Sequence, residues 1–381
     1  MIHDLSTDLT ARLHELARIN AAPGRVVSVY LNTRWSDEHQ RDRVRVFLKN
    51  ELRQARAGAP DAGLASDLDW IEAQGAALTS QAEVTDADGV ALYACHALGL
   101  RERHPVRVPF EDAFVVADAP YLRPLAALVE GTPSTLIVFV DSESARLIPL
   151  TSAGAGEEVT LQSEVPGHHR QGGWALLAQS RYQRHIQAHR DQHFEAVVES
   201  LTRLIEGDGI QGIVLAGETR AVAVFRPHLP PRLATRVVGA IPAARYEPAS
   251  ALAARAAELV ARVDAEEERA AVDAALTEAA KGGRAVASLE EALEAVGRGA
   301  VHRLFLLKGF REPGRRCTSC GALQRDHGPA CRLCGQPTEP RELGEALVER
   351  VLASGGRVDV LDAHDGLARV EGVAALLRYP L

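Results

Sequence analysis

The chain has 381 residues, of which 46% are apolar and 25% are charged. This composition excludes a wholly disordered protein, and the length favours two or three domains over one. The formal net charge of −8 argues against a protein wrapped in nucleic acid, because phosphate binding requires a basic surface. Any contact with RNA therefore has to be a local patch.

Neither a membrane segment nor a signal peptide is visible. No apolar run approaches the roughly 20 residues that a membrane helix needs. The amino terminus, MIHDLSTDL, lacks the basic region and the apolar stretch of a signal peptide. We expect a cytoplasmic monomer with no membrane partner.

The first 130 residues mix helical and strand patterns. A helical pattern opens the chain, a strand is predicted over residues 25–31, and an amphipathic helix with Val44, Leu48 and Leu52 at helical spacing follows. Residues 57–62 are rich in Gly, Ala and Pro and predict a loop. Further strands are predicted over residues 90–95, 106–108 and 114–116. These elements predict an N-terminal α/β domain over residues 1–130.

A second domain is predicted after a Gly-Thr-Pro linker that follows Glu130. Its expected elements, in chain order, are strands over residues 135–140, 145–150 and 159–162, a long helix over 174–205, and strands over 210–216 and 236–241 with a helix between them. Strands that alternate with helices predict a layered α/β domain over residues 131–263.

The last part of the chain begins with a helix. Residues 251–280 are rich in Ala, Glu and Arg without an internal breaker, which predicts a helix that bridges to a third domain. Ser288 and Glu291 form a capping box, and residues 301–307 predict a buried strand. A cysteine cluster precedes a helix near 343–352 and two strands. The predicted fold class is mixed α/β (α+β) in three domains, the third over residues 264–381.

Four of the five cysteines form two CxxC pairs separated by ten residues, namely Cys317 and Cys320, then Cys331 and Cys334. Two intervening residues let both thiolates of a turn face one ion, and the glycine after each pair permits the bend of a knuckle. Four thiolates fill a tetrahedral shell, so we predict a structural Zn²⁺ ribbon over residues 317–334. A thioredoxin-like redox pair would leave the second CxxC unexplained. Cys95, in an apolar stretch, is predicted to be a buried small hydrophobe.

Five arginines lie in or near the cysteine cluster: Arg311, Arg315, Arg316, Arg325 and Arg332. A surface that faces RNA and a merely solvated face explain this charge equally well.

The most unusual stretch is a polar loop that ends in Gly172, Gly173 and Trp174. Adjacent glycines permit a backbone that approaches a ligand closely. Trp174 either stacks on a nucleobase or packs the start of the next helix onto its domain, and composition alone favours packing.

The helix after this loop carries a basic stripe. Arg181, His185 and His189 recur every four residues and share one face. Metal binding by the two histidines is an alternative, but no carboxylate completes an HExxH pattern, so phosphate contact is favoured. The candidate RNA-binding residues are therefore His168, His169, Arg170, Arg181, Arg184 and His185.

Taken in order, these features resemble the archaeo-eukaryotic class-I release factors and Pelota along nearly the whole chain. Residues 88–95 (DGVALYAC) resemble the end of that family's first domain, and residues 135–141 (TLIVFVD) the start of its central domain. The sequence HRQGGW over 169–174 stands where those factors have a basic run ending in GGQ, and His193-Phe194 resembles a His-aromatic pair in their next helix.

The third domain carries the resemblance as well. Residues 288–301 resemble the family's helix that leads into a Gly-Ala-Val strand, and 372–379 resemble its terminal strand. Archaeal members insert a CxxC–CxxC ribbon in this domain, as this chain does. The most similar branch is the bacterial one, which includes the hibernation factor Balon.

The resemblance implies a translation factor that binds rRNA in the ribosomal A site, beside the P-site tRNA. Its central loop would enter the peptidyl-transferase centre, and its third domain would contact a tRNA-delivering GTPase such as EF-Tu. Two departures are evident, because stop-codon elements such as NIKS and YxCxxxF are missing and Trp174 replaces the glutamine of GGQ. We therefore expect a hibernation or quality-control factor.

The alternative is an enzyme, a codon-independent peptidyl-tRNA hydrolase that rescues stalled ribosomes. In that case Gly172 and Gly173 would shape the catalytic loop, and the backbone N–H of Trp174 would stabilise the oxyanion. An indole donates through one N–H only, which makes selection of the attacking water less effective.

Overall fold

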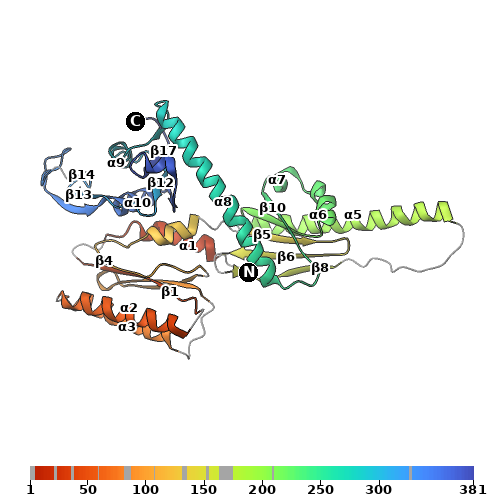
Figure 1. Ribbon diagram of the computed structural model, residues 1–381, viewed down its shortest axis with the longest axis horizontal. Helices are drawn as coiled ribbons and strands as arrows, with labels where there is room; N and C mark the ends of the chain where they lie inside the picture. Colours follow the sequence, from red (N-terminus) through yellow and green to blue (C-terminus); the bar gives the residue numbers. More distant parts are fainter. Residues whose placement is uncertain are drawn as a thin grey trace. The chain divides into compact units, whose positions relative to one another are not determined.

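The computed structural model describes residues 5–20, 24–35, 38–58, 60–80, 87–106, 108–130, 135–151, 154–162, 175–207, 210–325 and 328–381. The chain divides into two compact units (Figure 1). The central unit contains residues 132–264 together with 1–7. The flanking unit contains residues 8–131 and 265–381.

The amino-terminal part of the flanking unit is built on an antiparallel sheet of order β3-β2-β1-β4. The strands are β1 (Val26–Asn32), β2 (Gly89–Cys95), β3 (Leu100–Val106) and β4 (Ala113–Ala117), with a 3₁₀ turn η1 (His96–Leu98) between β2 and β3. Two helices, α2 (Glu38–Ala57) and α3 (Ala62–Thr79), pack on one face through a buried apolar cluster (Figure 1).

The carboxy-terminal part of the same unit contains a second sheet, of order β11-β17-β12-β16. Its strands are β11 (Ala285–Val286), β12 (Val301–Leu307), β16 (Arg357–Leu361) and β17 (Val373–Leu377). Helices α9 (Leu289–Gly297) and α10 (Leu343–Ala353) belong to the main core, and α11 (Asp365–Ala368) belongs to a smaller cluster with the end of α8.

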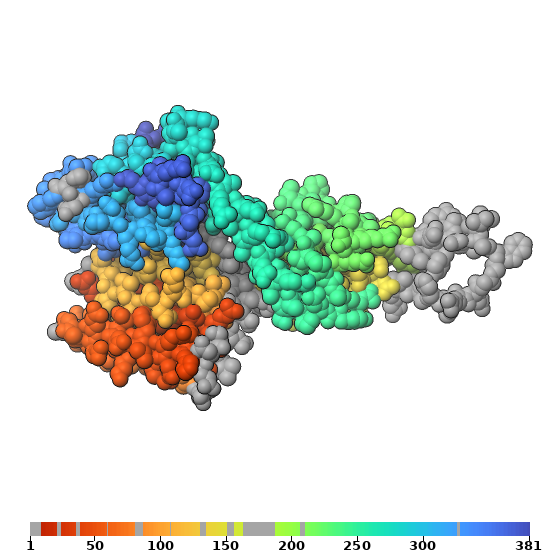
Figure 2. All heavy atoms as spheres, viewed as in Figure 1, coloured from red at the N-terminus to blue at the C-terminus, as the bar shows by residue number. Residues whose placement is uncertain are grey.

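A single core joins these two parts of the chain. Helices α1 (Leu5–Leu16) and α4 (Arg123–Glu130) lie in it with the other face of the first sheet, α9 and α10. Leu13 and Leu125 are thus buried in one cluster with Leu293 and Leu347. In Figure 2, amber atoms of the amino-terminal part contact blue atoms of the carboxy-terminal part. The two ends of the sequence therefore fold as one unit.

The central unit has a mixed sheet of order β10-β9-β5-β6-β7, with β8 also paired to β6. Strands β5, β9 and β10 are parallel, and β6 is antiparallel to β5. The strands are β5 (Thr135–Val140), β6 (Ser144–Thr151), β7 (Gly154–Ala155), β8 (Val159–Gln162), β9 (Gly212–Gly217) and β10 (Val237–Pro242).

Helices cover both faces of this sheet. One face packs on α5 (Ala175–Gly207), α6 (Thr219–Phe225), η2 (Arg226–His228) and α7 (Pro231–Ala234). The other face packs on the first half of α8 (Ala249–Ala280).

A small three-stranded sheet, of order β14-β13-β15, carries the cysteine cluster. Its strands are β13 (Pro313–Cys317), β14 (Leu323–Arg325) and β15 (Thr338–Glu342).

The predicted mixed α/β class is confirmed. The long helices predicted over residues 174–205 and 251–280 are also confirmed, and they run over 175–207 and 249–280. The capping box is present with a small change, because Ser288 accepts from the Glu291 N–H while Glu291 accepts from the N–H of Ala287. Helix α3 was not predicted, and β3 lies over residues 100–106 rather than 106–108. The division into three domains stays a prediction.

No helix within the described ranges combines the length and the apolar character that crossing a bilayer requires. Cys95 is fully buried among apolar side chains, as predicted.

Candidate functional site

Two turns of equivalent geometry hold the four cysteines. In the first turn, the Cys317 N–H donates to the carbonyl of Ala322 at 2.8 Å, and the Gly321 N–H donates to the carbonyl of Cys317 at 3.1 Å. In the second turn, Cys331 and Gln336 form the corresponding 2.8 Å bond, and Gly335 donates to Cys331 at 2.9 Å. Gly321 and Gly335 have φ of 71° and 72°, which is the left-handed conformation that glycine adopts without strain.

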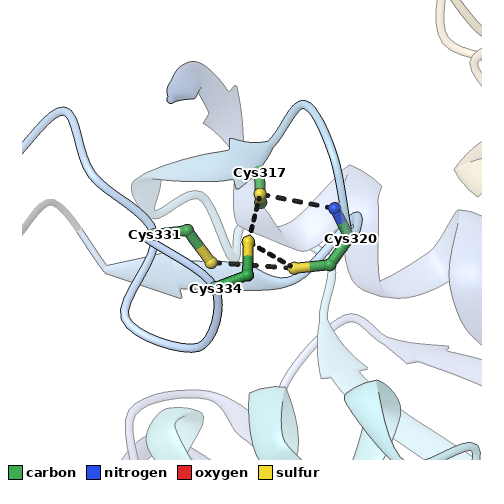
Figure 3. A group of neighbouring side chains, drawn as sticks. All are labelled: Cys317, Cys320, Cys331 and Cys334. Carbon is green, nitrogen blue, oxygen red and sulfur yellow. Dashed lines mark hydrogen bonds between the residues drawn. The ribbon is translucent and has the colours of Figure 1, made fainter. Parts of the chain in front are cut away.

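The four sulfurs converge on one point (Figure 3). All Sγ atoms lie within 4.8 Å of one another. The Sγ distances are 3.5 Å from Cys317 to Cys334, 3.7 Å from Cys320 to Cys331, and 3.5 Å from Cys334 to Cys320. A Zn–S bond of 2.3 Å in a tetrahedral shell requires sulfurs about 3.8 Å apart. The arrangement is therefore compatible with a four-thiolate zinc site.

Backbone donors support the thiolate form of the first cysteine. The N–H groups of Cys320 and Ser319 each lie 3.4 Å from the Cys317 Sγ, and they lower the pKa of that thiol to about 6. Cys317 and Cys331 are buried, whereas Cys320 and Cys334 are exposed. Because metal ligation by cysteine needs the thiolate, these N–H···S contacts favour a bound cation.

A buried glutamine fixes the second turn. The Gln324 side chain donates to the carbonyl of Ala330 at 3.2 Å and accepts from the N–H of Arg332 at 3.0 Å. Nothing in the CxxC spacing indicated this residue, which lies on β14 between the cysteine pairs.

Four of the five arginines of this region contact groups within the flanking unit. Their partners are Thr338 for Arg315, Glu349 for Arg316, Glu371 for Arg325 and Glu290 for Arg332. Ion pairs inside the unit therefore account for much of this charge, and they favour a solvated face over an RNA-binding one.

The predicted catalytic loop falls outside the described residues. This applies to Gly172, Gly173 and Trp174, and also to His168, His169 and Arg170. The other three candidates, Arg181, Arg184 and His185, belong to helix α5, and their side chains lie outside the described part.

Helix α5 continues well beyond the point where it packs on the sheet (Figure 1). Among its residues with described side chains, 187–205, the first buried residue is His193, and the apolar face then runs from Phe194 to Ile205. At a rise of 1.5 Å per residue, Ala175 lies about 27 Å along the axis from His193. We call residues 175–192 the α5 arm.

The His193-Phe194 pair marks the base of this arm. Burial lowers the pKa of His193, so the neutral imidazole is favoured at this position. The Phe194 ring contacts Phe225 and His228, with centroids 5.2 and 5.1 Å apart. The pair is therefore part of the core and adds no cation to the basic stripe.

A clamp beyond the carboxyl end of β5 was missed by the sequence reasoning. Arg245, which follows β10, donates to Asp141 at 2.6 Å and to Glu143 at 3.0 Å. Although burial opposes ionisation, Arg245 and the N–H groups of Glu143 and Ser144 lower the pKa of Asp141 to about 2. A polar pocket of about 590 Å³ lies beside this clamp, with the 90% exposed Tyr246 in its lining. The available signal was the Asp-Ser-Glu-Ser turn directly after a buried strand.

Residues 120–266 match the model of the bacterial archaeo-eukaryotic release factor family 10. This segment, less than half of the chain, contains nearly all of the central unit. No curated protein matches the chain.

Solved structures show similarity at low identity. The archaeal translation termination factor aRF1 is 18% identical, with 98% of each chain covered and a TM-score of 0.27. Pelota from Archaeoglobus fulgidus is 13% identical, covering 100% of this chain and 94% of its own, with a TM-score of 0.35.

Dom34 from S. cerevisiae, described as a translation termination-like factor that interacts with Hbs1, is 13% identical over 77% of this chain and 87% of its own, with a TM-score of 0.40. Residues 120–266 are thus similar to the bacterial branch of the archaeo-eukaryotic release factor family.

Proposed function

We propose that this protein is a ribosome-associated translation factor that binds the A site and acts in hibernation or quality control. The observation that carries the proposal is the family match over residues 120–266. That segment contains Gly172, Gly173 and Trp174 as well as the whole of α5.

The α5 arm gives this proposal a physical basis. Helix α5 begins at Ala175, directly after Trp174 in the chain, and its first residues extend beyond the core. Residues 175–192 contain three arginines and one aspartate, in a chain whose net charge is −8. A local basic segment on an extended helix suits contact with RNA phosphates, which a globally acidic surface would not provide.

Trp174 distinguishes the two candidate activities. Stacking of an aromatic side chain on a nucleobase contributes roughly 1–3 kcal/mol, enough to make the tip of the loop an anchor. Hydrolysis of peptidyl-tRNA would instead require a positioned water, for which an indole offers a single donor. We therefore place Trp174 as an anchor at the peptidyl-transferase centre.

The proposal also includes two partners and one metal. A tRNA-delivering GTPase such as EF-Tu would bring the protein to the ribosome, and the P-site tRNA would lie beside it. Cys317, Cys320, Cys331 and Cys334 would hold one structural Zn²⁺. This ion would stabilise the small sheet and leave no open position for substrate.

Co-sedimentation with purified ribosomes tests this function. We expect binding that weakens steeply as salt rises, and a several-fold loss of binding in Trp174→Ala. Tyr246→Ala is the matched control, because it removes a 90% exposed aromatic ring from the same unit. Failure to sediment with ribosomes at low salt would refute the proposal.

Release of peptide from ribosome-bound peptidyl-tRNA decides between the two activities. A hibernation or quality-control factor leaves the ester intact. Multiple-turnover release by the wild-type protein, abolished in Trp174→Ala, would replace the binding function with the hydrolase.

A further inference from the structure

Strand β4 is an open edge of the first sheet. It pairs with β1 on one side, and no other strand in the described part of the chain pairs with it. Its five residues, Ala-Phe-Val-Val-Ala, are all partly exposed, although β1 and β2 of the same sheet are almost wholly buried. The apolar composition of β4 is typical of a buried strand. Its side chains are partly exposed because the strand lies at the edge of the sheet.

A cavity of about 480 Å³ runs along this edge. Its lining includes the consecutive residues 113–115 of β4. Successive strand residues point to opposite faces, so a cavity that touches three in a row lies along the edge of the sheet rather than on a face. Phe47 and Glu51 of α2 form one wall, and Glu345 and Val348 of α10 contribute to the other. We call this cavity the β4 groove.

The β4 groove is acidic. Five carboxylates line it, those of Glu51, Asp112, Glu342, Glu345 and Glu349, against the two guanidiniums of Arg311 and Arg341. Arg341 is also engaged with Asp118 and, at 2.8 Å, with Glu349. Glu342 and Glu345 pair with the buried Arg123 at 3.7 and 2.8 Å, so Glu51 and Asp112 carry most of the remaining negative charge beside the apolar strand edge.

We propose that the β4 groove binds an extended basic peptide segment of a partner protein as an added β-strand. In an antiparallel pair, alternate residues direct their N–H and C=O groups away from the partner strand, so β4 offers such groups along its free edge. Five residues span about 16 Å, enough for an added strand of similar length. Main-chain hydrogen bonds would hold the peptide, and Glu51 and Asp112 would select lysine and arginine side chains.

Charge argues against a second copy of this chain as the occupant. Pairing two β4 edges would bring two acidic grooves together, and facing like charges are unfavourable. The proposal does not depend on ribosome binding, because it rests on the edge strand, the cavity and the charge of the flanking unit alone.

Amide hydrogen exchange of the full-length protein tests this inference. The probe is a blocked hexapeptide with alternating lysine and valine, compared with its glutamate–valine counterpart and with a version carrying a central proline. We expect alternate amides of residues 113–117 to exchange about tenfold more slowly when the free lysine peptide is about nine times its Kd. The proline version should bind more weakly, since it cannot donate at that position.

Glu51→Lys should weaken the lysine peptide about fivefold, because it replaces an attractive charge with a repulsive one on the groove wall. The matched control is Glu258→Lys, an exposed position of the central unit, which should leave the affinity unchanged. Unaltered exchange at residues 113–117, equal binding of the glutamate peptide, or concentration-dependent dimers that protect these amides would each overturn the proposal.

Discussion

Glu345 provides the sharpest test of the energetics of the flanking unit. Its carboxylate lies 2.8 Å from Nε of Arg123, whose side chain is only 6% exposed. Burial raises the pKa of Glu345 from 4.5 to about 7, against the opposing charge of Arg123. The structure thus sets desolvation against an ion pair, and it predicts that desolvation is the larger effect.

The raised pKa fixes the sign of the pH dependence. A carboxyl whose folded pKa exceeds its unfolded value binds its proton more tightly in the folded state. The stability from this proton is fully present below about pH 4.5 and is lost as pH rises through about 7. With these two pKa values, the free energy of unfolding is lower than that with a permanently neutral side chain by about 0.8 kcal/mol at pH 5 and by about 3.3 kcal/mol at pH 8. On going from pH 5 to pH 8, the free energy of unfolding of Glu345→Gln should therefore rise by about 2.5 kcal/mol relative to that of the wild type.

Urea unfolding at constant ionic strength measures this difference. Trp35 and Trp70 lie in the flanking unit, so a Trp174→Phe background makes tryptophan fluorescence report on that unit. Glu339→Gln, at an exposed position of β15, is the matched control and should show no comparable gain. If the stability of Glu345→Gln relative to wild type is unchanged or lower at pH 8 than at pH 5, the ion pair with Arg123 outweighs burial and the reasoning is wrong.

Three further predictions concern the same unit. Atomic emission should find one zinc per wild-type chain and a large loss of bound metal in Cys334→Ser; a wild-type chain purified without zinc, or an undiminished content in the variant, would contradict the structural site. Arg123→Ala should destabilise the flanking unit by about 3–5 kcal/mol in the urea assay at pH 8, where Glu345 is mostly ionised, because it removes the donor to the carbonyl of Phe310 and leaves the Glu345 carboxylate without its partner; a loss below about 1 kcal/mol would show that these contacts are dispensable. In a fragment of residues 1–264, residues 8–131 should no longer unfold cooperatively, since their core is shared with the removed segment. A near-UV circular dichroism spectrum of the fragment with wild-type intensity would count against the shared core.

Local patterns predicted the features whose causes are local. Helix α8 follows from a long run of helix-forming residues without a breaker, and β5 follows from a continuous apolar run. The cysteine turns were equally accessible, because CxxC spacing and a following glycine determine the turn that both pairs adopt.

Helix α3 shows where local patterns fail. It is rich in alanine and carries two glycines, so its apolar stripe is weak in the sequence. Asp61 nevertheless caps it by accepting from the Leu64 N–H at 2.8 Å, and Leu68 and Ile71 bury against α2 and the sheet. The sequence offered two signals for α3, the Asp61 cap and a weak periodicity of apolar residues. Most of the stability of this helix comes from tertiary packing.

The β4 groove was beyond prediction for a different reason. Its walls come from residues near 50, 115 and 345, and no sequence pattern relates segments this far apart. The acidic excess becomes visible only when α2, β4 and α10 are brought together in the folded unit.

The family match falls on the part of the chain that folds as the central unit. The central unit has its own cores, built from residues 136–260, and residues 120–266 carry the match. The flanking unit is made from two segments on either side of it. Loop-closure entropy grows only logarithmically with length, by about 0.6 kcal/mol for each doubling, so an intervening domain adds little cost to a large shared core. Leu13 and Leu125 pack in one cluster with Leu293 and Leu347, so a substitution in either flanking segment is constrained by the other. The cores of the central unit, by contrast, are built from one continuous stretch of sequence, so they do not share this constraint.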